Sequence, residues 1–245
     1  MNQILAFAPS FTGVATESSD RQFVKLLYND DEVEKLETFF DSETLLKEEA
    51  TLSNFKTKAS GFNVFHLATH ASANDEKPDY SYLAFTESKD SAQGNILYIK
   101  DLYNMTLHAD MVTLSACQTG IGKLQKGQGM MSLSKGFYYA GAKSLVNTLW
   151  KINDKSTVKL MGFFYEELSK GKSKTEALRV AKLKYLESTD DELLKHPYYW
   201  AAFTVSGDTA PLVKNSSWHY YTVFALLVLV GLVYFRRKRN RALAA

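Results

Sequence analysis

The sequence predicts an α/β domain built on a mostly parallel sheet that helices cover on both faces. Short and almost unbroken apolar runs are typical of buried strands, and segments with helical periodicity separate them. Strands that alternate with helices favour parallel pairing, because each crossover needs a helix. The length of 245 residues and the apolar share of 45% fit one such domain with an appendage better than two domains.

The elements follow from these patterns in chain order. Strands are expected at 3–8, 62–71, 81–86, 96–99, 111–117, 144–149 and 201–205. The runs 81–86 and 96–99 flank a polar stretch with Gly94, which is typical of a hairpin. Two amphipathic helices are expected within 31–57, followed by helices at 129–139, 155–169 and 173–187. In such sheets, functional residues gather at the carboxyl ends of the strands.

The distribution of charge excludes one class of partner. Five basic residues between 236 and 241 more than account for the net charge of +2, so the rest of the chain is mildly acidic. No basic stripe remains to neutralise phosphates, and no nucleic-acid partner is expected. Cys117 is the only cysteine, which excludes an intrachain disulfide and a site built from several thiolates.

Residues 218–235 are predicted to be a transmembrane helix. They carry no formal charge, have aromatic residues at both ends, and would span roughly 27 Å as a helix. The alternative is a buried core helix. We therefore expect a domain at 1–213, a linker at 214–217, the membrane helix at 218–235 and a basic tail at 236–245.

For a single-pass helix at 218–235, the sequence indicates two different sides of the membrane for the domain. The positive-inside rule puts the tail in the cytoplasm and the domain on the far side. No signal peptide is recognisable at Met1. Either an upstream region is missing, or the protein is tail-anchored and breaks the charge rule.

His70 and Cys117 are the candidate catalytic residues. Each ends an expected central strand, so both should emerge at the same edge of the sheet. An imidazole can deprotonate a thiol and then protonate a leaving amine. The amides of Ala71 and Cys117 are candidate oxyanion donors. The alternative for Cys117 is a small buried hydrophobe in a strand.

Three other catalytic patterns do not fit. His66 and His70 are four apart, as in zinc metallopeptidases, but Leu67 replaces the glutamate base, and residues four apart on a strand are about 13 Å distant. His66 is therefore interpreted as an internal strand residue that supports its neighbours. The stretch 122–127 has the span of a phosphate-binding loop, but Gln128 stands where a lysine is needed. No GxSxG motif of a serine hydrolase occurs.

Five ordered motifs carry a resemblance to a known family. They are HLATHA at 66–71, LSACQTG at 114–120, the glycine-rich stretch and helix at 127–142, WKIND at 150–154 and HPYYWAAF at 196–203. With these motifs the sequence resembles the CHAT family of bacterial caspase-like cysteine peptidases, which are relatives of caspases, separases and gingipains.

The resemblance implies hydrolysis of a protein substrate by a His70–Cys117 dyad through a thioester, on an α/β/α sandwich, with no required metal or other cofactor. Family members often follow tetratricopeptide repeats, so a repeat partner or a missing upstream repeat domain is expected. Ala71 departs from the glycine of many relatives, which affects the oxyanion assignment. Two alternatives to a general endopeptidase stay open: a catalytically silent scaffold that acts as a membrane-bound interaction module, and a self-processing regulator.

The resemblance also implies where a substrate side chain binds. In caspase-like enzymes the strand after the catalytic one lines the pocket, which here means Leu149, Trp150 and the loop to Asp154. An acidic Asp154 would suit a basic side chain. Its alternative role is to cap the helix that begins near Lys155.

Overall fold

The computed structural model describes residues 3–11, 23–74, 76–88, 94–115, 117–118, 128–150 and 152–213, with the backbone alone for 117–118 and 128–132. The chain divides into two units, Met1–Val213 and Lys214–Ala245, and all described residues belong to the first. The predicted linker, membrane helix and basic tail therefore lie outside the described residues. Within the described ranges, no helix combines the length and the apolar character needed to cross a membrane.

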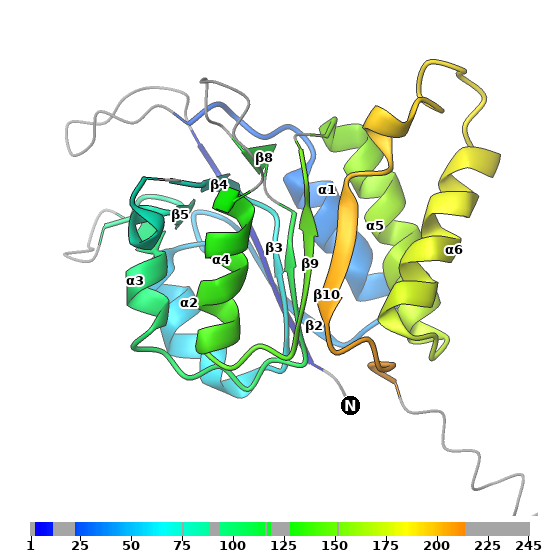
Figure 1. Cartoon of the computed structure of the whole chain (residues 1–245). Helices are drawn as coiled ribbons and strands as arrows, with labels where there is room; N and C mark the ends of the chain where they lie inside the picture. Colours follow the sequence, from blue (N-terminus) through cyan, green and yellow to red (C-terminus); the bar gives the residue numbers. More distant parts are fainter. Residues whose placement is uncertain are drawn as a thin grey trace, which may run out of the picture. The chain divides into compact units, whose positions relative to one another are not determined.

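The main sheet has six strands in the order β10-β9-β7-β3-β1-β2 (Figure 1). All neighbouring pairs are parallel except β9 and β10, which are antiparallel. The prediction of a mostly parallel sheet is confirmed. The strands are β1 (Ile4–Pro9), β2 (Ser42–Lys47), β3 (Val64–Leu67), β7 (Met111–Leu114), β9 (Ser144–Thr148) and β10 (Phe203–Gly207).

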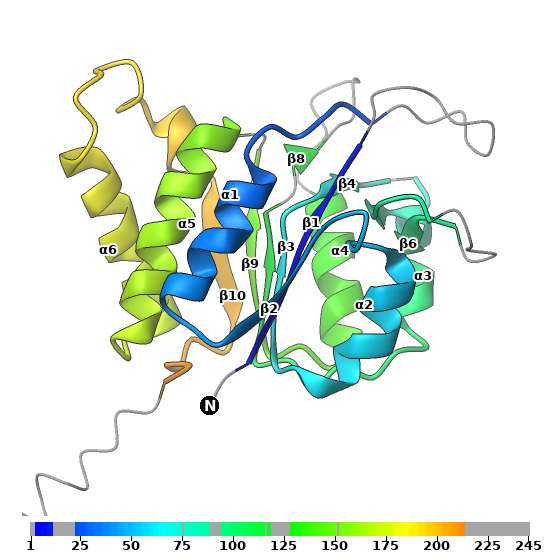
Figure 2. The same cartoon turned by 180° about the vertical axis from the view of Figure 1, so that it is seen from behind.

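Helices cover both faces of this sheet (Figures 1 and 2). One face carries α2 (Leu52–Lys58), α3 (Ile99–Leu102) and α4 (Gln128–Tyr139), and the other carries α1 (Asn29–Glu34), α5 (Asp154–Ser169) and α6 (Lys174–Glu187). Successive residues of β1 alternate between the two cores: Leu5 and Phe7 pack on the α2 side, and Ile4 and Ala6 on the α5 side. Short 3-10 helices occur at Lys35–Thr38, Ala59–Gly61, Pro78–Tyr80 and Pro197–Tyr199.

A second, smaller sheet has the order β6-β5-β4-β8. Its strands are β4 (His70–Ser72), β5 (Tyr82–Ala84), β6 (Ile96–Tyr98) and β8 (Cys117–Gln118). The antiparallel pairing of β5 with β6 confirms the predicted hairpin. β4 and β8 are parallel, and each begins three residues after the end of a main-sheet strand, β3 and β7 respectively.

Three predicted segments differ from the structure. The runs 62–71 and 111–117 were each expected as one strand, but both leave the main sheet midway and continue in the small sheet. The stretch 42–47, expected as helix, is the edge strand β2, parallel to β1. Leu45 packs in the core on the α2 side and Leu46 against the core on the α5 side, so adjacent leucines point to opposite faces, as strand geometry requires.

Candidate active site

Two successive pairs of parallel strands position the predicted dyad residues. β3 pairs with β7 so that Leu67 lies opposite Leu114. After both segments leave the main sheet, β4 pairs with β8 so that His70 lies opposite Cys117. Register partners on neighbouring strands are about 4.8 Å apart. The structure therefore brings together the backbones of two residues that are 47 positions apart in the sequence.

The imidazole of His70 is held in an aromatic environment. The side chain is buried, and its ring centroid lies 4.7 Å from that of Phe11 and 5.5 Å from that of Phe23, which stacks on it. Nε2 lies 2.6 Å from the carbonyl oxygen of Val24. Because a carbonyl only accepts, Nε2 carries the hydrogen, and Nδ1 is then the basic atom of the neutral ring.

The turn between β3 and β4 is fixed by side chains from other elements. The hydroxyl of Thr69 donates to the carbonyl of Ala84 in β5 at 2.5 Å. The amide of Asn29, the first residue of α1, donates to the carbonyl of Pro9 at 2.8 Å and to that of Ala68 at 3.4 Å. These bonds hold the segment that leads into His70 against both sheets and α1.

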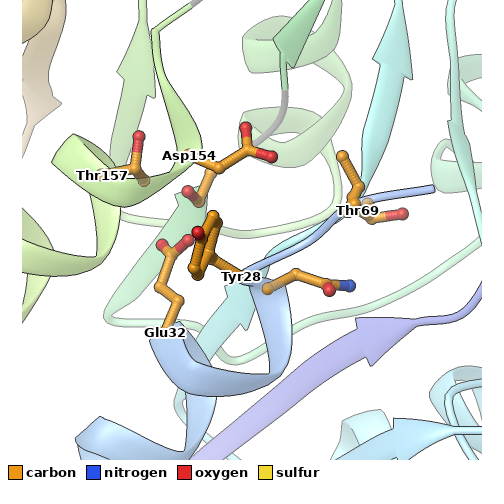
Figure 3. A pocket seen from close by; sticks show the side chains of 8 residues that line it. Tyr28, Glu32, Thr69, Asp154 and Thr157 are labelled. Carbon is orange, nitrogen blue, oxygen red and sulfur yellow. The ribbon is translucent and has the colours of Figure 1, made fainter. Parts of the chain in front are cut away.

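A small pocket adjoins the strands that lead to the dyad residues. Its lining includes Glu32 of α1, Asp154 and Thr157 of α5, Thr69, which precedes His70, and Ser115, which lies two residues before Cys117. Figure 3 shows Glu32 extending from α1 and Asp154 and Thr157 standing at the start of α5, with Thr69 on the other side of the pocket. The described lining contains two carboxylates and no lysine or arginine. The charged side chains of the described lining are therefore all acidic.

The three residues predicted for the substrate pocket lie in different surroundings. Asp154 lines the pocket. Leu149 follows β9 and is 58% exposed, and the indole of Trp150 donates to the carbonyl of Tyr198 at 2.9 Å. Neither is among the described residues that line this pocket.

Asp154 is not the cap of α5, contrary to its expected alternative role. It is the first residue of that helix, and Asn153 before it is the N-cap. The side-chain oxygen of Asn153 accepts from the amides of Lys155 and Ser156 at 3.1 and 3.3 Å. The carboxylate of Asp154 is therefore not needed for capping.

The predicted oxyanion donor Ala71 is buried in β4. It lies opposite Leu83 of β5 on one side and Gln118 of β8 on the other. Its backbone is therefore held by strands on both sides, next to the residue that follows Cys117.

His66 belongs to a buried polar network of Glu32, His66, Tyr165 and Thr113. Nε2 of His66 lies 2.9 Å from Oε1 of Glu32, and Nδ1 lies 3.0 Å from the hydroxyl of Tyr165. The Tyr165 hydroxyl also lies 3.0 Å from Oγ1 of Thr113. All four side chains are buried. Over the described residues, no group of three or more His, Cys, Asp or Glu side chains is arranged to hold a metal ion.

Sequence reasoning missed most partners of these residues. Glu32 lies in an acidic helical stretch, where a solvated carboxylate is the ordinary interpretation. Tyr165 looks like any apolar position of an amphipathic helix, and the Val24 carbonyl is a backbone group with no residue signal. The first histidine of HLATHA was the one available sign of a buried polar partner.

Comparison with solved structures defines the class of fold. The Arg-specific cysteine proteinase gingipain R matches with a TM-score of 0.53 and 12% identity, over 86% of this chain and 47% of that one. The complex of Porphyromonas gingivalis RgpB pro- and mature domains matches with a TM-score of 0.50 and 14% identity, over 86% and 48%. At this identity the likeness shows the fold, which is that of the caspase-like cysteine proteinases.

The sequence comparisons show the family. A family model described as "CHAT domain" matches residues 2–208, and the chain belongs to this family. Tetratricopeptide repeat protein 28 of Mus musculus is 29% identical over 122 residues, which are 50% of this chain and 5% of that protein. The Homo sapiens protein of the same name is 27% identical over the same lengths. The match spans about a twentieth of these relatives, and it gives no support to the expected bacterial origin.

Proposed function

We propose that the chain is a membrane-anchored cysteine endopeptidase in which His70 activates Cys117. The observation that carries this proposal is the pairing of β4 with β8, which sets His70 opposite Cys117 in the backbone. The hydrogen bond from Nε2 to the Val24 carbonyl supports it, because the neutral ring then has a basic Nδ1. Membership of the CHAT family supports the same chemistry.

The reaction follows from these roles. His70 takes the proton of the Cys117 thiol, and the sulfur attacks the carbonyl carbon of the scissile peptide bond. The amides of Ala71 and Cys117 stabilise the oxyanion. The tetrahedral intermediate collapses to a thioester while His70 gives its proton to the leaving amine. His70 then deprotonates a water molecule, which hydrolyses the thioester and releases the acid.

We propose a preference for a basic side chain before the scissile bond. Asp154 and Glu32 supply two carboxylates to a pocket whose described lining holds no cationic side chain. Leu149 and Trp150 contact neighbouring parts of the substrate at the rim. The Arg specificity in the name of the gingipain neighbour agrees with this preference.

The remaining parts of the proposal concern the membrane and a partner. Residues 1–213 are the peptidase domain, 214–217 a linker, 218–235 a single membrane helix and 236–245 a basic tail. The tetratricopeptide relatives support regulation by a repeat partner or by an upstream repeat domain.

A peptide library tests the catalytic proposal. The full chain in detergent micelles is incubated with peptides that vary at the position before the cleaved bond, and products are identified by mass. We expect cleavage after Arg and Lys that Cys117→Ala abolishes, and a reduced preference for basic residues in Asp154→Asn. Cleavage that persists in Cys117→Ala would contradict the dyad, and a complete lack of cleavage would favour the silent scaffold.

Fractionation tests the anchor. The full chain should stay with membranes after alkaline carbonate extraction, whereas a chain that ends at Val213 should be released. Release of both would contradict the membrane helix. Protease protection of the domain in sealed vesicles then reports which side it faces.

A further inference from the structure

One hydroxyl group joins the two strands that lead to the dyad residues. His66 of β3 and Thr113 of β7 are register partners. The hydroxyl of Tyr165, which comes from α5, lies 3.0 Å from Nδ1 of His66 and 3.0 Å from Oγ1 of Thr113. We call these three side chains the Tyr165 bridge. They are completely buried, so water does not compete for the bonds.

The hydrogen bonds of the polar network all point in the same direction, from Thr113 toward Glu32. The carboxylate of Glu32 accepts from Nε2 of His66, so in the neutral ring Nδ1 accepts from Tyr165. The Tyr165 oxygen then accepts from the Thr113 hydroxyl. Burial raises the pKa of Tyr165, which keeps this hydroxyl protonated as a donor. Each link has one donor and one acceptor.

The bridge lies at a fixed spacing from the dyad residues. His66 and Thr113 are register partners, and so are His70 and Cys117. On both segments the second residue follows the first by four positions. Whatever fixes the register of β3 against β7 therefore also sets His70 opposite Cys117.

Apolar packing on both faces favours this register, and the bridge adds a directional constraint to it. A slip by two residues would keep each side chain of β3 on its own face, and apolar contacts have no directional preference. Hydrogen bonds from one hydroxyl to both strands do not survive such a slip, which would move a strand by about 6.6 Å. The bridge thus adds a geometric criterion for the register to the one that core packing provides.

We propose that the Tyr165 bridge positions the dyad, with His66, Tyr165 and Thr113 as positioning residues, and connects it to the substrate pocket through Glu32. The proposal rests on the proposed function, since it takes His70 and Cys117 as the reacting pair. None of the three bridge residues touches the substrate in this role.

The test is the pH dependence of Cys117 alkylation. Cys117 is the only cysteine, so the second-order rate constant with iodoacetamide between about pH 5 and 10 reports this thiol alone in the full chain in micelles. In the wild-type protein we expect a midpoint below the ordinary thiol pKa of about 8.5. Tyr165→Phe should move the midpoint toward that value and slow alkylation at pH 7 by about fivefold or more.

Tyr185→Phe is the matched control. Tyr185 is a buried tyrosine of the same core cluster, and its hydroxyl lies 3.0 Å from Oγ of Ser156. This bond joins α6 to α5 and contacts neither strand of the bridge. The substitution should lower the melting temperature as Tyr165→Phe does, but it should keep the wild-type alkylation profile.

Two variants of Thr113 test the positioning role of the bridge independently, also if Tyr165→Phe does not fold. Thr113→Val keeps the shape and loses the hydroxyl, whereas Thr113→Ser keeps the hydroxyl. We expect the Val variant to reproduce the shifted profile and the Ser variant to keep the wild-type profile.

His70→Ala separates the two proposals. If this substitution leaves the wild-type profile unchanged, the dyad itself fails, and with it the proposed function. If His70→Ala changes the profile, the dyad stands. The positioning role is then overturned if Tyr165→Phe has the same profile as Tyr185→Phe, or if Thr113→Val has the same profile as Thr113→Ser.

Discussion

The two faces of the main sheet are built differently from the same strands. On the α2 side, β3 and β7 present apolar residues, and Phe55 meets Phe7, Phe65 and Phe85 at ring distances of 5.5 to 6.0 Å. On the α5 side, the same strands present His66 and Thr113 in the polar network. We call the α2 side the apolar face. We call the α5 side the polar face, because it adds the directional hydrogen bonds of this network to an apolar cluster of its own.

The largest effect is expected on the apolar face. Phe55→Ala should lower the free energy of unfolding by about 3 to 5 kcal/mol, because the side chain is completely buried among three aromatic rings and leaves a cavity. Denaturant titration measures it. The folded fraction should keep its Cys117 reactivity. A loss below about 1 kcal/mol would show that the aromatic cluster repacks and that the contrast between the faces is weaker than described.

On the polar face, the effect depends on which partner remains. His66→Leu should lower the free energy of unfolding by about 2 to 4 kcal/mol, since it leaves the buried Glu32 carboxylate without its donor. The double variant Glu32→Leu with His66→Leu should recover part of this loss, because no orphaned charge remains. Denaturant titrations of the two single variants and the double variant give the coupling energy.

No recovery in the double variant would contradict this interpretation. The loss would then come from packing, as on the apolar face. The same titrations on Phe55→Ala with Phe85→Ala give the reference, in which the second truncation should add to the first loss.

A smaller effect is expected at the outer side of the polar face, where Glu167 of α5 bonds to the amino groups of Lys170, Lys172 and Lys184. Burial raises the pKa of this carboxyl group, but the three lysines lower it more, to about 2 from its ordinary 4.5. A lowered pKa means that the carboxylate stabilises the fold above about pH 4.5 and that this contribution is lost as the pH falls toward 2.

Glu167→Gln measures this contribution. Between pH 7 and pH 3 the wild-type protein should lose about 1 to 2 kcal/mol more stability than the variant, since the partly exposed lysines weaken the full linkage value. Equal losses would show that this ion-pair group adds nothing to folding. Glu32, which bonds to His66 of β3, would then be the carboxylate on this face that contributes more to stability.

The sequence predicted the features that local pattern encodes. Most of the strand-like runs, the helices after residue 128, the hairpin of 81–86 with 96–99 and the closeness of the His70 and Cys117 backbones follow from apolar periodicity and the parallel-sheet rule. It did not predict β2, because Leu45 and Leu46 fit a helical face as well as two faces of an edge strand. Nor did it predict that the segments 62–71 and 111–117 each pass from the main sheet into the small sheet. An apolar run does not reveal the position at which it stops pairing with one strand and begins to pair with another.

Within the candidate site, the sequence predicted only that His70 and Cys117 lie close together. His66 was interpreted as a support, but its partners Glu32 and Tyr165 lie 34 and 99 residues away. The His70 ring contacts Phe11, Phe23 and the Val24 carbonyl. These residues lie far from His70 in the sequence, and no local pattern connects them to it. The family resemblance implies Asp154 as a pocket residue, and only the fold shows that Asn153, not Asp154, caps α5.

Covalent labelling of Cys117 tests the central claim most directly. The full chain is treated with a peptide acyloxymethyl ketone that carries Arg at its reactive end, and intact mass gives the labelling rate. The account predicts one label, absent in Cys117→Ala, and a rate at least about tenfold lower in His70→Ala, because the base is lost. Equally slow labelling of the wild-type protein and His70→Ala would contradict the account.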